Sequence, residues 1–307
     1  MVQYTGVLGL GVMSVAMLLA VRPASLENGL HGLDKMYRLH KWLGIAGLVL
    51  AVTHWLWAKA PKWLVQAGWL ERPQRGPRTE QTVEIFRFFQ SQRGLAEQVG
   101  EWAFYAAVLL IAIALVKRFP YRHFFTTHRW LAVVYLVLVL HAVVLLNFPA
   151  WSTPLGAVMA LLMLAGSVAA CVSLLRRIGT QRKAVGVIEN IERLEGVSVN
   201  AVTLQLQNRW AGHEAGQFAF VTFDAREGAH PFTISSAWHG DGRLLFLIKE
   251  LGDYTRTLAS SLQPGDLVTV EGPYGRFNFE SPSRHQIWIG GGIGITPFVA
   301  RMKALAA

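Results

Sequence analysis

Cysteine and charged residues are scarce in this sequence. Its 307 residues include one cysteine, Cys171, within an apolar run, and only 16% of them are charged. A single cysteine excludes an intrachain disulfide scaffold and a cluster of thiolate metal ligands. The sequence has no collagen-like or other internal repeat, and its 52% apolar residues exclude a disordered chain. The low charge and a mean hydropathy of +0.33 predict that part of the chain faces lipid.

Acidic residues are especially scarce in the first part of the chain. Residues 1–180 contain 17 Lys and Arg against 7 Asp and Glu, whereas residues 181–307 contain 12 of each. The net charge of +10 therefore belongs to the first part. Because the excess lies in segments between apolar runs, it is typical of the positive-inside signal of membrane proteins. We reject nucleic acid as a partner on this ground.

Five apolar segments are long enough, or nearly so, to cross a bilayer, which takes about 20 helical residues. They cover residues 2–21, 42–58, 99–116, 130–151 and 153–175. The first lacks a basic start and a small-residue cleavage pattern, so it is not interpreted as a signal peptide. We predict an all-α helical membrane bundle over residues 1–178, with the lipid bilayer as its partner.

Basic residues between the spans predict the orientation of the bundle. Three connections are basic and are expected on the cytoplasmic side of a plasma or inner membrane. Their basic residues are Arg22, Lys35 and Arg38; Lys117, Arg118, Arg122 and Arg129; and Arg176, Arg177, Arg182 and Lys183. The segment 59–98 is also basic and departs from the rule. We interpret it as an outer amphipathic segment, with Trp63 and Trp69 near the interface.

The apolar period shortens to two after about Ala184, which indicates strands separated by turns. Short strands at this spacing predict an antiparallel β-barrel over residues 182–282. Ile287, Trp288 and Ile289 then precede a glycine-rich run and a helical tail. Residues 283–307 are therefore predicted to be a strand, a glycine turn and a helix, the first βα unit of a nucleotide-binding domain.

Four histidines form two pairs within the second and fourth spans. His40 and His54 are fourteen residues apart, and His128 and His141 are thirteen apart, or about 21 and 20 Å along a helix. Because these spans run in the same direction, His40 can face His128 on the cytoplasmic side, and His54 can face His141 toward the outside. Two facing pairs stacked across the bilayer match the layout of two bis-histidine haems.

Each of these histidines could instead pack against a helix or a water, although polar side chains at such depth tend to be functional. Thirteen residues leave two side chains about 140° apart on an ideal helix, so the fourth span is predicted to contain a bulge, tilt or rotation. His31 and His123 lack matched partners and are predicted to be interfacial loop residues.

Four short segments carry a resemblance to a known family. They read HPFTISS at 230–236, IKELGDYTRTL at 248–258, EGPYGRF at 271–277 and GGGIGITPF at 290–298. With the histidine spacings they resemble the NADPH oxidase and ferric reductase superfamily, whose cytoplasmic half is similar to ferredoxin-NADP reductase. The resemblance covers nearly the whole chain. HPFT with the paired histidines is its specific part, whereas GGGIG alone is a weak signal.

The resemblance implies that the HPFT segment binds FAD. Phe232 would lie against the isoalloxazine face, Thr233 would hydrogen-bond the flavin edge near N5, and His230 would help to hold the FAD. The other candidates in this segment are Pro231, Ser235 and Ser236. The alternative is an ordinary barrel strand.

Two further segments are implied to bind the phosphates of cofactors. Gly252, Tyr254 and Thr255 would open a helix whose amides bind the FAD pyrophosphate, with Lys249 adding charge; a plain capped helix is the alternative. A glycine turn would receive the pyrophosphate of NAD(P)H after a strand. Its residues are Gly290, Gly291, Gly292 and Gly294, followed by Thr296 and Pro297. The family usually has six spans and a full nucleotide domain, so we expect a chain trimmed at both ends that binds NADPH poorly.

These features predict transmembrane electron transfer. Electrons from cytoplasmic NAD(P)H would pass through FAD and two b-type haems to an outside acceptor, ferric iron or dioxygen, with the cofactors carrying the chemistry and no side chain predicted to be catalytic. One alternative is a cytochrome b-type electron-carrier subunit that a separate reductase, or a missing C-terminal domain, reduces. Another is a helical bundle with incidental histidines and no haem, against which the HPFT segment argues.

Overall fold

The computed structural model describes residues 1–71, 83–116, 118–283 and 285–306. Residues 72–82, which are part of the predicted outer segment 59–98, lie outside this range. Lys117, in the basic connection between the third and fourth predicted spans, also lies outside it. The chain separates into two compact units. The first contains residues 1–26 and 35–178, and the second contains residues 27–34 and 179–307. The segment 27–34, which joins the first two predicted spans, thus groups with the barrel and not with the helices.

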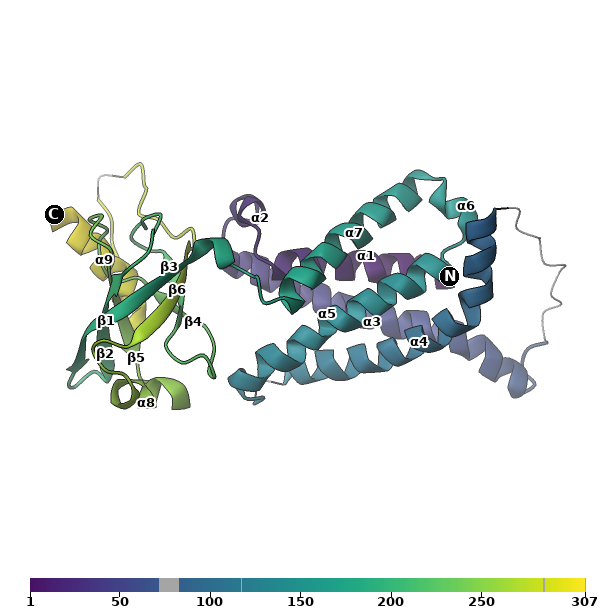
Figure 1. Cartoon of the computed structure of the whole chain (residues 1–307), viewed down its shortest axis with the longest axis horizontal. Coiled ribbons are helices and arrows are strands. Elements are labelled where there is room, and N and C mark those ends of the chain that lie inside the picture. The colour runs from purple at the N-terminus through teal and green to yellow at the C-terminus, as the bar shows by residue number, and fades with distance from the viewer. Residues whose placement is uncertain (72–82, 117, 284, 307) are drawn as a thin grey trace. The chain divides into compact units, whose positions relative to one another are not determined.

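The first unit is helical, and among its described residues five helices are long and apolar enough to cross a membrane. These are α1 (Val2–Ala20), α3 (Leu33–Gln66), α4 (Glu84–Leu115), α5 (Tyr121–Leu145) and α7 (Pro154–Leu174). Two short helices, α2 (Ala24–Gly29) and α6 (Phe148–Trp151), lie between them in sequence. The long helices run side by side (Figure 1), and α5 packs against α1, α4 and α7.

Several of the predicted span boundaries within the bundle are wrong. The fourth span ends at Leu145 rather than at residue 151, because Pro149 has no amide hydrogen to bond the carbonyl four residues earlier, and the chain restarts as α6. The same helix begins at Tyr121, so His123 is helical and not a loop residue. The second and third spans extend well beyond their apolar parts, since polar turns at their ends continue the helical hydrogen bonding.

Small residues and one tyrosine hold the core of the bundle together. Tyr135 of α5 is fully buried, and its hydroxyl lies 2.8 Å from the Ser14 hydroxyl of α1. A methyl group at Gly166 of α7 would overlap the Tyr135 ring. Glycine at this position therefore lets α7 approach α5 closely, as is common between membrane helices.

The second unit is built on one six-stranded antiparallel sheet with the order β4-β3-β6-β1-β2-β5. The strands are β1 (Lys183–Leu194), β2 (Val199–Leu206), β3 (Phe218–Thr222), β4 (His230–Thr233), β5 (Arg243–Lys249) and β6 (Leu267–Tyr274). A bridge between Ile234 and Phe246 joins the two ends of the sheet. The sheet therefore closes on itself, and the predicted antiparallel barrel is confirmed.

The interior of the barrel is filled from alternate positions of the strands. On β2 these are Val202, Leu204 and Leu206, as the sequence pattern suggests. On β5 the buried positions are Leu244, Phe246 and Ile248, within a segment whose residues 244–248 are all apolar. A run apolar on both faces has no alternation by which its inner face can be identified.

The end of the chain contains a helix but lacks the predicted strand. A short 3₁₀ turn, η2 (Gly292–Ile295), leads into α9 (Thr296–Ala306). Ile287 and Ile289 are 90% and 87% exposed and belong to no strand. A strand needs a hydrogen-bonded neighbour, and the described residues place none beside this segment. The glycine turn and the helix are therefore present, but the βα unit is not formed.

Candidate functional site

The structure brings the four intramembrane histidines together in two pairs. The ring centres of His40 on α3 and His128 on α5 are 5.9 Å apart. Those of His54 on α3 and His141 on α5 are 6.4 Å apart. The two rings of each pair are strongly inclined, by 68° and 86°. The facing arrangement predicted from the spacing is present at both levels of the bundle.

The Nδ1 atoms of three of these imidazoles are held by backbone carbonyls of neighbouring helices. His40 Nδ1 lies 2.9 Å from the Ala16 carbonyl, and His54 Nδ1 lies 3.1 Å from the Val2 carbonyl. His141 Nδ1 lies 2.8 Å from the carbonyl of Ala96 on α4. A bond from Nδ1–H to a carbonyl leaves Nε2 as the available lone pair, which is how protein scaffolds orient histidine ligands of metals.

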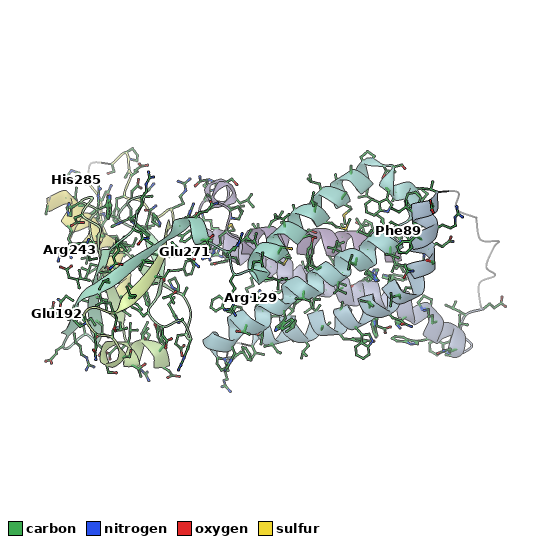
Figure 2. The ribbon with its side chains drawn as sticks, in the orientation of Figure 1. Phe89, Arg129, Glu192, Arg243, Glu271 and His285 are labelled. Atoms are coloured by element: carbon green, nitrogen blue, oxygen red, sulfur yellow. The ribbon has the colours of Figure 1, made fainter. Side chains whose placement is uncertain are left out.

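The first helix supports both histidines of α3 with one spacing. Val2 and Ala16 are fourteen residues apart on α1, as are His54 and His40 on α3. Two antiparallel helices therefore meet at both levels in the same relation. His128 differs, because its Nδ1 is buried and has no hydrogen-bond partner among the described residues. The ring of Phe124, one turn earlier, stacks on His128 at 5.0 Å, and Arg129 follows it on α5 (Figure 2).

Glycines lie directly against the outer pair. A methyl group at Gly100 of α4 would overlap the His141 ring, and one at Gly6 of α1 would lie 3.0 Å from His54 Cε1. Glycine lowers helix stability by about 1 kcal/mol relative to alanine. Its presence at these two sites in apolar helices is accounted for by the close approach of the rings.

This geometry fits two haems with axial histidines. An imidazole nitrogen binds a metal at about 2 Å, and the ring centre lies about 1 Å farther, so two axial imidazoles have centres about 6 Å apart. Both measured separations agree with this value. Among the residues that the structure describes, no three His, Cys, Asp or Glu side chains gather as a metal site, so two donors per site are what the helices offer.

Of the bulge, tilt or rotation expected in the fourth span, the bulge is not found. α5 is a continuous α-helix from Tyr121 to Leu145 although its histidines are thirteen residues apart. His141 lies next to α4, where the Ala96 carbonyl and Gly100 contact its ring. We attribute the meeting with His54 to the direction of this side chain, since the helical backbone is unbroken.

In the barrel, the HPFT segment forms part of an aromatic row. β4 pairs with β3 and presents the rings of His230 and Phe232 on one face, 6.3 Å apart. Tyr254 from α8 (Asp253–Ser261) stacks on His230 at 4.5 Å. Phe232 is half-buried and packs against Phe223 and the barrel core, whereas Pro231 is exposed. The row thus joins two segments that the sequence assigned to FAD.

Burial keeps this row uncharged near neutral pH. It lowers the pKa of His230, an effect that the charge of Glu227 partly offsets. Burial, together with the nearby acids Asp224 and Glu227, raises the pKa of Tyr254 to about 12. Stacking of neutral rings, rather than a positive charge on His230, is therefore what this part of the barrel offers a cofactor.

Several other predicted FAD residues also serve the barrel itself. Ser235 is fully buried, and its hydroxyl accepts a hydrogen bond from the Leu247 amide. The Ser236 hydroxyl accepts one from the Leu245 amide. Both bonds cross the seam between β4 and β5. The Thr255 hydroxyl accepts the amides of Leu251 and Gly252 at 3.0 Å and caps α8. Thr233 is half-buried opposite Phe218.

The predicted phosphate residues come from two segments that the fold brings together. Lys249 ends β5, and its Nζ lies 3.8 Å from where a methyl group at Gly292 would stand. Gly291 and Gly294 border open space, whereas Gly290 lies against the Phe298 ring. Thr296 is buried at the start of α9, and Pro297 occupies its first turn. A cation and a glycine turn at a helix start therefore lie side by side.

Sequence reasoning missed the groups that support the histidines. The Val2, Ala16 and Ala96 carbonyls carry no sequence signal, because every residue has one. Gly6 and Gly100 do carry a signal, since glycine in the middle of an apolar helix indicates a close approach. The missed groups contact three of the four histidines that the spacing identified, His40, His54 and His141.

Comparison with known proteins agrees with this arrangement. The family described as ferric reductase like transmembrane component matches residues 5–139, and the FAD-binding domain matches residues 190–278. NADPH oxidase 1 of Mus musculus is 31% identical over 34% of this chain and 19% of the relative. Dual oxidase 2 of Rattus norvegicus is 23% identical over 89% and 18%. Ferric reduction oxidase 5 of Arabidopsis thaliana is 39% identical over 25% and 12%.

The two family matches and the relatives named above fit the NADPH oxidase and ferric reductase superfamily. The chain spans less than a fifth of the length of each of these three relatives.

Proposed function

We propose that this protein transfers electrons across a plasma or inner membrane, from NAD(P)H on the cytoplasmic side to an acceptor outside. The observation that carries the proposal is the pair of facing histidine pairs on α3 and α5, at two depths of one bundle. When bound, FAD would take a hydride from NAD(P)H and two haems would carry its electrons singly to ferric iron or dioxygen.

The residues of the bundle would bind and orient the two irons. His40 and His128 would hold the inner haem, and His54 and His141 would hold the outer one. The outer haem, held by His54 and His141, would supply one-electron transfer to the acceptor.

The barrel would bind the flavin next to its aromatic row. The stacked rings of His230 and Tyr254 are neutral at physiological pH and suit the flat, apolar faces of a flavin. The start of α8, with the charge of Lys249, would receive the FAD pyrophosphate, and the Gly290–Gly294 turn would receive that of the nicotinamide cofactor.

The sidedness of the proposal is supported by the basic connections. Arg22 lies between α1 and α3, Lys35 and Arg38 lie in the first two turns of α3, and Arg176 and Arg177 follow α7. The first three of these residues flank segment 27–34 in sequence, and the last two directly precede segment 179–307. Both segments belong to the unit that contains the barrel. By the positive-inside rule, we propose that these residues, and with them the barrel, lie on the cytoplasmic side.

The test is a count of haem and flavin per chain in the detergent-purified protein. We expect two haems and one FAD in the wild type, and a reduced-minus-oxidised spectrum of two b-type centres. His54→Ala should remove one haem and leave the flavin. His123→Ala, on the same helix as His128 but in ring contact with Phe119, is the matched control and should keep both haems.

Two results would change this conclusion. Loss of neither haem in His54→Ala would refute the pairing. Reduction of the haems by NADPH only after a second protein is added would favour the electron-carrier subunit over a complete reductase.

A further inference from the structure

The outer pair has a hydrogen-bonding side chain beside it. The Thr5 hydroxyl of α1 lies 3.2 Å from His54 Nδ1, although the two residues are 49 positions apart in sequence. Thr5 is buried within the bundle. Its hydroxyl also lies 3.0 Å from the Val2 carbonyl and 3.2 Å from the Met1 carbonyl.

The directions of these bonds follow from the groups involved. A carbonyl only accepts, so the single proton of the Thr5 hydroxyl is donated to Val2 or Met1. The lone pairs of Thr5 then remain for the Nδ1–H of His54, which also points at the Val2 carbonyl. His54 is thereby held as the tautomer whose Nε2 is the acceptor.

Thr5 is special among the supports of the histidines. The other Nδ1 partners in the described part of the bundle, at Ala16 and Ala96, are backbone carbonyls that no substitution removes. The Thr5 hydroxyl is a second hydrogen-bond partner for His54 Nδ1, beside the Val2 carbonyl. Gly6 follows Thr5 and lies close to the His54 ring: a methyl group added at Gly6 would be 3.0 Å from His54 Cε1. The ring therefore has little freedom to move.

We propose that Thr5 is a positioning residue for the outer metal centre: it orients His54 and increases the electron donation of its Nε2. The proposal rests on the proposed binding of a haem between His54 and His141. A hydrogen bond to the far nitrogen of a ligating histidine raises its basicity, and loss of such a partner typically weakens metal binding about 10- to 100-fold.

A defined change should follow from removing this hydroxyl. Thr5→Val keeps the shape of the side chain but deletes the acceptor, so His54 becomes a weaker donor and the ferric form of its metal is less stabilised. We expect the midpoint potential of one haem to become more positive and that haem to dissociate about tenfold faster. The lower end of the range applies because the Val2 carbonyl remains.

The experiment is a potentiometric titration of the full-length, detergent-purified protein, followed by its difference spectrum. Thr5→Val and Thr5→Ala should each shift one of the two reduction steps and leave the other, whereas Thr5→Ser should titrate like the wild type. Thr53→Val is the control, because Thr53 precedes His54 on α3 and its exposed hydroxyl bonds the Val49 carbonyl. It should leave both steps unchanged.

The outcomes separate this inference from the proposed function. A wild type with two haems, in which neither Thr5→Val nor Thr5→Ala shifts a step or speeds haem loss, would overturn the role of Thr5 alone. A wild type without an outer haem would overturn both, and the haem count identifies that case. An equal shift in Thr53→Val would also contradict the inference, since it would show that the effect is not due to the Nδ1 contact.

Discussion

The positions of the outer histidines, His54 and His141, depend on two neighbouring residues that have no side chain, Gly6 and Gly100. His141 lies against Gly100, and its Nδ1 reaches a carbonyl one turn earlier on α4. A carbon added at Gly100 would occupy space that the His141 ring fills. A bis-histidine site is sensitive to such displacement, because both ligands must keep their distance from one metal ion.

We therefore predict that Gly100→Ala removes or severely weakens the outer haem. The methyl group overlaps the His141 ring, so the ring has to turn away from His54. Haem content should fall from two to one per chain, measured by the reduced pyridine adduct. Gly94→Ala is the matched control on the same helix, because nothing lies within 4 Å of its added carbon. Two haems retained in Gly100→Ala would show that the outer site can repack.

A short connecting segment attaches to the barrel through one buried carboxylate. Glu27 is 5% exposed and bonds Arg182 at 2.9 Å and the Gly275 amide at 3.3 Å. The Arg182 guanidinium also lies over the Tyr274 ring, 4.9 Å from its centre. Tyr274 in turn donates to Glu271, which is labelled in Figure 2. The segment 27–34 joins the second unit through these contacts.

Arg182→Met should loosen the segment 27–34 more than Glu27→Gln does. Removing the cation leaves a buried carboxylate without its partner, which costs on the order of 3 kcal/mol, whereas the glutamine oxygen can still accept the Gly275 amide. Hydrogen exchange of residues 27–34 should become about 100-fold faster in Arg182→Met.

The control for this comparison is a second arginine of the barrel. Arg193 pairs with Glu250 at 3.3 Å, but its side chain is 62% exposed, and exposed pairs contribute about 0–1 kcal/mol. Arg193→Met should leave exchange of the segment unchanged. Equal exchange rates in Arg182→Met and the wild type would mean that other contacts hold the segment.

For the whole molecule, the proposed sidedness predicts a labelling pattern. In a Cys171→Ser background, a cysteine at Ala67, after α3, should react with a membrane-impermeant maleimide in intact cells. A cysteine at Ser281, exposed in the second unit, should react only after permeabilisation. The Cys171→Ser protein is the unlabelled control. Labelling of Ser281→Cys in intact cells would show that the barrel lies outside, and the proposed direction of electron flow would then be wrong.

Much of this architecture follows from short-range pattern. Helices that cross lipid must be apolar for about 20 residues, and strands of a barrel must alternate, so both units can be identified from neighbouring residues. The histidine pairs could be found for the same reason, since two ligands at fixed depths on parallel helices impose a spacing. The flavin segment was recognised by resemblance, and the structure adds that His230 stacks on Tyr254.

Other features depended on parts of the chain far apart in sequence. The approach of Thr5 to His54, the carbonyls behind three histidines, and the seam that Ser235 closes are contacts between different elements. No local pattern encodes them, because they depend on how helices cross and where a sheet closes. The unformed strand at Ile287–Ile289 has the same cause: strand-forming residues pair only when folding brings a partner to their edge.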